Sequence, residues 1–294
     1  MTRFAPTVRR ALWGGALIPA APRRRRQGRA AWVLPLLVLI LASLTGAARA
    51  QAPLRIVGGP STGGCIQGAL HLPLEGEGFQ TIHLDRSAFW GAPQTIARIE
   101  LLGQRAHAAG LPDLLIEDIS AARGGPLPGG HLSHQVGLDA DVGLDMTPRP
   151  PLDATARDTI VLPSLVRPDA RGIEPARWSP RVVTLLRLAA ELPDVDRILV
   201  NPAIKQQLCR EVTGDRSWLR LIRPWYGHAA HMHIRFRCPA GQGECAQMAP
   251  PPEGDGCDAT LQWWFDQLDQ PSRPSGPVKV PTPPAACRAI LAGR

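Results

Sequence analysis

The chain has 294 residues, of which 33 are basic and 25 are acidic, and its formal net charge is +8 at neutral pH. The excess charge lies in the first 50 residues, which contain nine arginines and no acidic residue, so that the remaining 24 basic residues nearly balance the 25 acids. A protein that tracks a phosphate backbone is expected to carry a basic stretch interleaved with aromatic residues, and no such stretch follows position 50. The composition therefore excludes nucleic acid as an expected partner.

Residues 1–50 have the pattern of a secretory signal peptide. An arginine-rich region precedes the apolar segment 31–45, and Ala48-Arg49-Ala50 offers a small-x-small cleavage site before Gln51. The alternative is a membrane anchor, but about 15 apolar residues are fewer than the roughly 20 that a spanning helix needs. We therefore predict cleavage, export to the periplasm, no stable membrane anchor, and a single domain over residues 51–294.

The exported part mixes short strands and helices. Residues 51–92 are Gly-rich and expected to be irregular, and residues 148–178 are expected to be a surface connection. Apolar spacing and proline positions predict helices at 93–110, 181–192 and 202–209. Strands are expected at 113–120, 138–144, 196–201 and 231–238. This order favours an α+β fold with helices packed outside an antiparallel sheet, followed by a Pro-rich tail from residue 249 that contains the aromatic patch WWF at 263–265.

The six cysteines all follow the expected signal peptide: Cys65, Cys209, Cys238, Cys245, Cys257 and Cys287. An even number in an exported chain predicts three disulfides, although six cysteines allow 15 pairings. Cys238 and Cys245 are the favoured local pair, because the short Gly- and Gln-containing segment between them can close a loop. Metal binding by thiolates is the weaker alternative, since the sequence contains no C-x2-C pair.

Five of the eight histidines form two clusters, GGHLSHQVGLDAD and WYGHAAHMHIRF. Neutral imidazole combined with carboxylate is a common ligand set for zinc. A catalytic zinc site needs three protein ligands and one open position for water. The two clusters therefore predict a zinc site built from two separated segments. The candidate residues are His131, His134, Asp139, Asp141, His228, His231 and His233.

The second cluster is expected to be a strand, in which residues two apart share a face. His231 and His233 then point to the same side, so that one can bind a metal while the other faces water or substrate. Asp139 and Asp141 share a face in the same way, and either could meet a zinc ion held by His134. The alternative is a buried polar network without a metal.

The sequence lacks the motifs of serine hydrolases and of H-E-x-x-H zinc peptidases. Penicillin-sensitive peptidases carry S-x-x-K, but neither Lys205 nor Lys279, the two lysines of the chain, follows a serine by three residues. There is also no G-x-S-x-G or H-E-x-x-H. An even set of exported cysteines argues against a free catalytic thiol. The pattern therefore favours metal-dependent chemistry over serine or cysteine catalysis.

The strings SHQVGLDAD and HMH resemble zinc peptidases of bacterial cell walls that share H-x6-D and H-x-H motifs, among them D-Ala-D-Ala dipeptidases and lysostaphin-like endopeptidases. Longer strings resemble the penicillin-insensitive murein endopeptidase family, from about residue 60 to Cys287: GGHLSHQVGLDADV, NPAIKQQLC, DRSWLRLIRPWYGHAAHMHIRFRCP and GDGC. The resemblance implies a periplasmic zinc metallopeptidase that hydrolyses the D-alanyl–meso-diaminopimelyl crosslinks of peptidoglycan and is insensitive to penicillin.

The resemblance also implies residue roles. His134, Asp141 and His233 match zinc ligands, and His131 matches a further metal-associated position. His231 and His228 match catalytic, substrate-facing histidines, either of which could act as general base or stabilise the oxyanion. The implied disulfides are Cys65–Cys287, Cys209–Cys257 and Cys238–Cys245.

The family can also carry a second metal at a subunit interface, which would imply a homodimer. Its histidine lies between the two clusters, and this sequence has none between His134 and His228. Two other functions stay open at this point. A peptidoglycan-binding module could use the WWF patch without catalysis, and a carboxypeptidase that releases dipeptides could use the same zinc chemistry.

Overall fold

The computed structural model describes residues 52–59, 62–128, 131–270 and 279–293. The chain divides into two units, Met1–Ala50 and Gln51–Arg294, and all the described residues belong to the second. The expected signal peptide lies outside the described residues, so its cleavage stays a prediction. Among the described helices, none has the length and apolar character that crossing a membrane requires.

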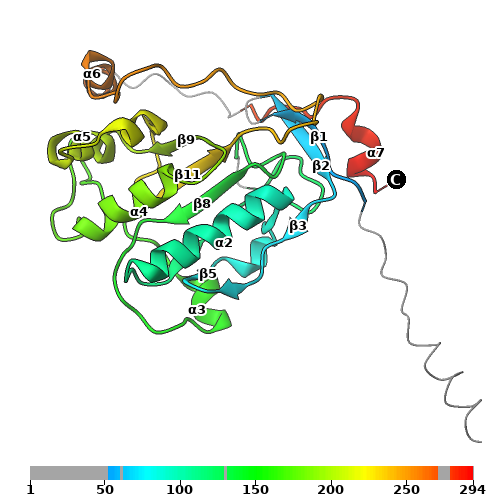
Figure 1. Cartoon of the computed structure of the whole chain (residues 1–294), viewed down its shortest axis with the longest axis horizontal. Coiled ribbons are helices and arrows are strands. Elements are labelled where there is room, and N and C mark those ends of the chain that lie inside the picture. The colour runs from blue at the N-terminus through cyan, green and yellow to red at the C-terminus, as the bar shows by residue number, and fades with distance from the viewer. Residues whose placement is uncertain (1–51, 60–61, 129–130, 271–278, 294) are drawn as a thin grey trace, which may run out of the picture. The chain divides into compact units, whose positions relative to one another are not determined.

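A seven-stranded mixed sheet in the order β10-β9-β11-β8-β7-β5-β4 forms the centre of the fold (Figure 1). Its strands are β4 (Glu75–Gly76), β5 (Phe79–Thr81), β7 (Leu114–Ile116), β8 (Asp139–Gly143), β9 (Val195–Val200), β10 (Ile222–Pro224) and β11 (His231–Phe236). Strand β11 pairs antiparallel with both β8 and β9, as expected.

The expectation of an antiparallel sheet is wrong for two pairs, because β5–β7 and β9–β10 are parallel. Parallel neighbours need a crossover connection, and a helix usually provides it. Helix α2 (Pro93–Ala108) lies between β5 and β7 in the chain, and α5 (Pro202–Glu211) lies between β9 and β10. Both helices begin with a proline at the first turn, where its missing N–H is not needed.

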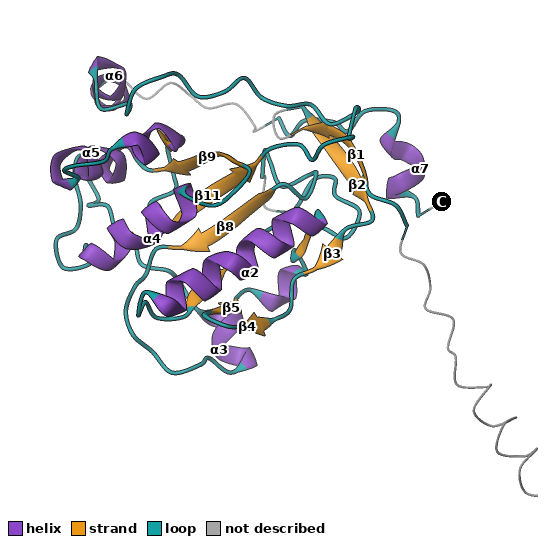
Figure 2. Ribbon diagram, viewed as in Figure 1, coloured by secondary structure: helices purple, strands orange, loops and turns teal. Residues whose placement is uncertain are grey.

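Helix α2 and helix α4 (Pro180–Ala190) cover one face of the sheet (Figure 2). Alternate residues of β8 and β11 pack into the same apolar core as these helices. They are Ala140, Val142, Met232, Ile234 and Phe236. Because side chains alternate along a strand, the residues between them face the opposite side, which carries the candidate site.

The remaining elements include several that the sequence did not predict. The segment expected to be irregular contains the hairpin β1 (Arg55–Gly59) and β2 (Gly63–Gln67) and the pair β3 (Leu70–His71) and β6 (Trp90–Gly91). The short helices are α3 (Ala154–Thr159), α6 (Ala259–Asp266) and α7 (Cys287–Leu291), with 3₁₀ turns η2 (Leu84–Arg86), η3 (Ser217–Leu221) and η4 (Gln267–Asp269). The strand expected at 113–120 ends at Ile116, where two carboxylates follow.

This unit contains three disulfides: Cys65–Cys287, Cys209–Cys257 and the local bond Cys238–Cys245. These are the pairs that the family resemblance implies. All six cysteines of the sequence lie in the described part, and each is paired. The first bond attaches α7 to β2, and the second attaches the segment before α6 to α5.

Candidate functional site

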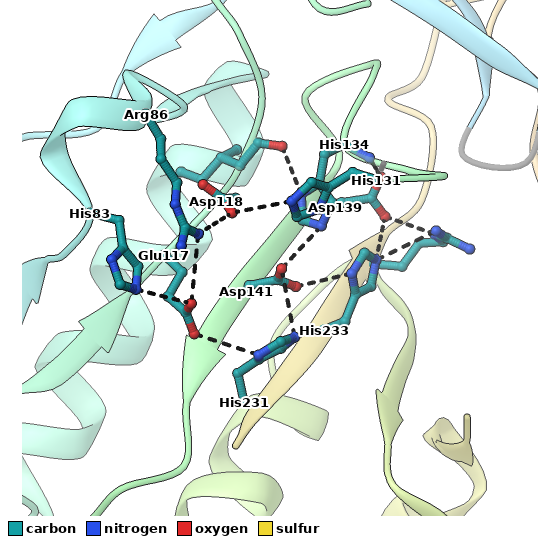
Figure 3. A network of polar contacts seen from close by, with 12 residues as sticks. His83, Arg86, Glu117, Asp118, His131, His134, Asp139, Asp141, His231 and His233 are labelled. Atoms are coloured by element: carbon teal, nitrogen blue, oxygen red, sulfur yellow. Dashed lines mark hydrogen bonds and ion pairs between the residues drawn. The ribbon is translucent and has the colours of Figure 1, made fainter. Parts of the chain in front are cut away.

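The pairing of β8 with β11 builds the centre of the candidate site. Asp141 lies directly opposite His233, and Asp139 lies opposite Arg235. Residues opposite each other on paired strands point to the same face. The register therefore brings two carboxylates, one imidazole and one guanidinium together on the side away from α2 and α4. Figure 3 shows Asp139, Asp141 and His233 close together.

His134 reaches this centre from the loop before β8. Its backbone has a left-handed φ of 63°, a conformation that surrounding contacts must stabilise in a residue other than glycine. The backbone N–H of His134 donates to Asp139 Oδ2 at 3.2 Å, and Nδ1 lies 3.0 Å from the carbonyl of Ile119. A carbonyl accepts only, so Nδ1 donates a proton to Ile119, and Nε2 lies 3.2 Å from Asp141 Oδ2.

His233 is oriented in the same manner by a carboxylate. Its Nε2 lies 2.9 Å from Asp139 Oδ1, which also accepts a hydrogen bond from Arg235 Nε at 2.8 Å. The other ring nitrogen, Nδ1, lies 3.0 Å from Asp141 Oδ1. Asp139 is thus occupied by protein donors, whereas Asp141 lies between the other ring nitrogens of His134 and His233.

This arrangement attracts a cation. Asp141 is 4% exposed, and its Oδ1 accepts no hydrogen bond from the described residues. Burial raises the pKa of the Asp141 carboxyl, but His134 and His233 outweigh burial and hold that pKa well below its usual value. Burial lowers the pKa of His134, but Asp141 reverses the effect and raises it to about 9. A buried carboxylate between two imidazoles is stabilised by one bound proton or by a metal cation.

His131 stands at the edge of this centre. A ring nitrogen of His131, a ring nitrogen of His134 and a carboxylate oxygen of Asp141 all lie within 4.8 Å of one another, which makes them a group that could hold a metal. His131 Nε2 also lies 3.7 Å from Asp118 Oδ2. Burial, followed by the charge of His134, lowers the pKa of His131.

His231 and His228 lie on the cleft side of the centre. His231 Nε2 is 3.8 Å from Asp141 Oδ2, and its side chain is 29% exposed. The His228 ring centre is 5.3 Å from that of His231, and His228 Nδ1 lies 3.0 Å from the carbonyl of Tyr226. Burial and the charges of His233 and His231 lower the pKa of His228 to about 4. His228 is therefore a neutral imidazole at physiological pH.

Sequence reasoning missed two carboxylates beside the centre. Glu117 Oε1 lies 3.6 Å from His231 Nδ1, and Asp118 Oδ2 lies 2.8 Å from Arg86 Nη1. Backbone hydrogen bonds set both acids beside Asp141. The N–H of Glu117 donates to the carbonyl of Asp141, and the N–H of Asp141 donates to the carbonyl of Asp118. The available signal was the acidic pair at the end of the apolar run LLI. His83 completes this arc, with Nε2 3.6 Å from Glu117 Oε2.

A cleft of about 790 Å³ opens over the histidines. Its far wall contains aromatic and basic side chains from β9, β10, α6 and the tail. They are Arg197, Arg223, Trp225 directly after β10, Trp264 and Lys279, and Leu199 of β9 adds an apolar side chain. Tyr226 Oη donates to the carbonyl of Trp264 at 2.6 Å, which fixes α6 against this wall. Of the WWF patch, only Trp264 lines the cleft, while Phe265 is buried.

Comparison with known proteins connects this geometry to a family. The family model described as penicillin-insensitive murein endopeptidase matches residues 56–292. The chain belongs to the penicillin-insensitive murein endopeptidase family. The match covers the whole sheet and all the clustered histidines, so the resemblance seen in the sequence motifs is confirmed.

Curated members of the penicillin-insensitive murein endopeptidases are similar over most of their length. A protein of that name from Klebsiella pneumoniae subsp. pneumoniae is 44% identical over 238 residues, which cover 79% of this chain and 85% of the relative. One from Haemophilus influenzae is 45% identical over 233 residues, covering 79% and 81%. One from Yersinia enterocolitica is 40% identical over 270 residues, covering 88% and 96%.

Proposed function

We propose that this chain is a zinc-dependent endopeptidase that hydrolyses the D-alanyl–meso-diaminopimelyl crosslinks of peptidoglycan. The observation that carries the proposal is the convergence of His134 Nε2 and His233 Nδ1 on the Asp141 carboxylate at the base of a cleft. Membership of the family supports the substrate, since the relatives bear the name murein endopeptidase. The arginine-rich, apolar leader supports export to the periplasm, where peptidoglycan lies.

The metal would be held by His134, Asp141 and His233, with His131 at the edge of the site. The donors are two imidazole nitrogens and a carboxylate, a set that suits zinc. Each histidine has its second nitrogen fixed by an acceptor, Ile119 O for one and Asp139 for the other, which is the usual support of metal-binding histidines. When bound, zinc would supply a Lewis acid for the scissile carbonyl and activate water for attack.

The protein's own groups then handle the proton and the developing charge. His231 is half-open to the cleft and faces Asp141 through Nε2, so it is placed to accept a proton from water or to stabilise the oxyanion. Glu117 lies on the opposite side of the same ring and is placed to orient it. His228 is neutral because its pKa is low, and its Nδ1 donates to the carbonyl of Tyr226, so its Nε2 can accept a hydrogen bond from the substrate. No serine takes part, so a β-lactam finds no nucleophile to acylate, which explains the proposed insensitivity to penicillin.

The decisive experiment is digestion of purified, crosslinked peptidoglycan, followed by identification of the products by mass. We expect uncrosslinked muropeptides to accumulate, and we expect a chelator to stop the reaction and added zinc to restore it. Release of terminal dipeptides would identify a carboxypeptidase instead. Binding without any product would indicate a non-catalytic wall-binding module. Activity that is unaffected by chelation would contradict metal dependence.

A further inference from the structure

The basic wall of the cleft lies in register with the metal centre. Directly opposite residues run across four strands of the sheet, from Asp141 on β8 to His233 on β11, Leu199 on β9 and Arg223 on β10. Paired residues share a face, so all four point to the same side of the sheet. All four also line the cleft. Two strand spacings put the Cα of Arg223 about 10 Å from that of His233.

Arg223 is set apart from the other arginines of this cleft by having no partner. Arg235 is bound to Asp139, and Arg197 is bound to Asp196. Within the described residues, the guanidinium of Arg223 makes neither a hydrogen bond nor an ion pair, although the residue is only partly exposed. Lys279, which also lines the cleft, has no acidic partner among these residues either.

The surroundings of Arg223 favour the binding of an anion to its guanidinium. Burial and the charge of Arg197 lower the pKa of its guanidinium, Arg220 acts in the same direction, and Asp258 opposes them. The ammonium group of Lys205 lies nearby, hydrogen-bonded to two backbone carbonyls and to no carboxylate. A partly buried guanidinium among other cations is most strongly stabilised by a carboxylate or a phosphate, which it can bind through two parallel hydrogen bonds.

We propose that Arg223 forms the carboxylate-binding subsite of the cleft and holds a free carboxylate of the peptide substrate while the scissile bond lies over the histidines. The inference rests on the proposed function for the identity of the substrate. Diaminopimelate supplies such a group, because its carboxylate next to the crosslinking nitrogen stays free. The glutamyl α-carboxylate of the stem peptide is a second source of the same chemistry. A spacing of about 10 Å between Cα atoms suits either group, since an arginine side chain bridges part of it.

The test compares matched crosslinked dimers, one with both carboxylates free, one amidated at the diaminopimelyl carboxylate and one amidated at the glutamyl carboxylate. Each is measured with the zinc-loaded wild-type chain, with Arg223→Gln and with the control Arg220→Gln. Arg220 binds the carbonyls of Pro251 and Pro252 and does not line the cleft, so its substitution removes an equal charge outside the subsite.

We expect wild type to prefer the free dimer over one of the amidated dimers by about 10- to 100-fold in kcat/KM, mainly through KM. Arg223→Gln should lose that preference, and Arg220→Gln should keep it. The amidated dimer that wild type rejects identifies the carboxylate. The subsite would be overturned if the preference survived in Arg223→Gln. It would also be overturned if wild type cleaved both amidated dimers as well as it cleaves the free dimer.

Binding by calorimetry separates this inference from the proposed function. The measurement uses His231→Ala with and without Arg223→Gln, so that the dimer is not consumed. We expect the double variant to bind the free dimer about 10- to 100-fold more weakly. A wild type that cleaves no dimer would contradict the proposed function, but equal binding by the single and double variants would contradict the subsite alone. Unfolding temperatures check the fold, and loss of an unpaired cation should not lower them.

Discussion

The two ends of the cleft differ in how their charges are satisfied. At the histidine end, Asp139 is surrounded by donors from the protein, and Asp141 is held between two imidazoles. At the β10 end, Arg223 has no partner among the described residues. In our proposals a zinc ion would complete the first end, and a carboxylate of the substrate would complete the second. The difference teaches that one face of a sheet can present a buried carboxylate and an unpaired guanidinium along a single row of residues. Two such opposite charges would orient a substrate that lies between them.

The largest effect should come from removing a residue at the histidine end. Asp141→Ala, His134→Ala and His233→Ala should each lose zinc and all measurable activity, because two of three ligands hold the ion too weakly. Metal analysis of the purified variants, together with peptidoglycan digestion, checks this expectation. If Asp141→Ala kept its zinc and Asp139→Ala lost it, the carboxylate ligand would have been misassigned.

His231→Ala should separate metal binding from turnover. We expect the variant to keep its zinc and its fold while kcat falls by roughly 10²–10⁴-fold, the usual contribution of acid–base or oxyanion assistance. Zinc content and steady-state kinetics on a crosslinked dimer measure the two quantities. Loss of zinc would make His231 a ligand, and near-normal turnover would transfer the catalytic role to His228.

Asp139→Asn should have an intermediate effect. The amide keeps the shape and can still accept from Arg235, but it no longer supplies the charge that fixes the tautomer of His233. Loss of such support typically weakens metal binding about 10–100-fold. A chelator titration of the variant against wild type measures the change. An affinity equal to that of wild type would show that Asp139 has no part in orienting His233.

The smallest effect on activity concerns Lys205, which lies near Arg223. Here we expect a change in stability alone. Burial and the charge of Arg223 lower the pKa of its ammonium group to about 7, from an ordinary value of 10.5. Below about pH 7 both folded and unfolded chains bind the proton. Between about 7 and 10.5 only the unfolded chain does, so each pH unit of that window adds about 1.4 kcal/mol to folding stability.

Denaturant unfolding at several pH values measures this slope. Lys205→Met should lack it, and Arg223→Gln should narrow the window, because removal of the neighbouring charge raises the pKa of Lys205. An unchanged slope in Lys205→Met would assign the pH dependence to another group.

Local patterns made part of this protein predictable from sequence. The helices α2, α4 and α5 follow from apolar spacing and an initial proline, and the paired histidines follow from motifs that keep them close in the chain. Glu117 and Arg223 could not be found in that way. Their positions depend on which strands become neighbours, and β7 and β10 are each only three residues long, too short to show a periodicity. The short strands of residues 55–91 escaped prediction for the same reason.

The bond between Cys65 and Cys287 has a consequence for how the protein matures. A chain exported N-terminus first delivers Cys65 before the other five cysteines and Cys287 after them. Oxidation in order of arrival would join Cys65 to Cys209 and Cys257 to Cys287, and only Cys238–Cys245 would be native. With the export that we predict, maturation would therefore require either a delay in oxidation or a thiol–disulfide exchange that corrects early bonds.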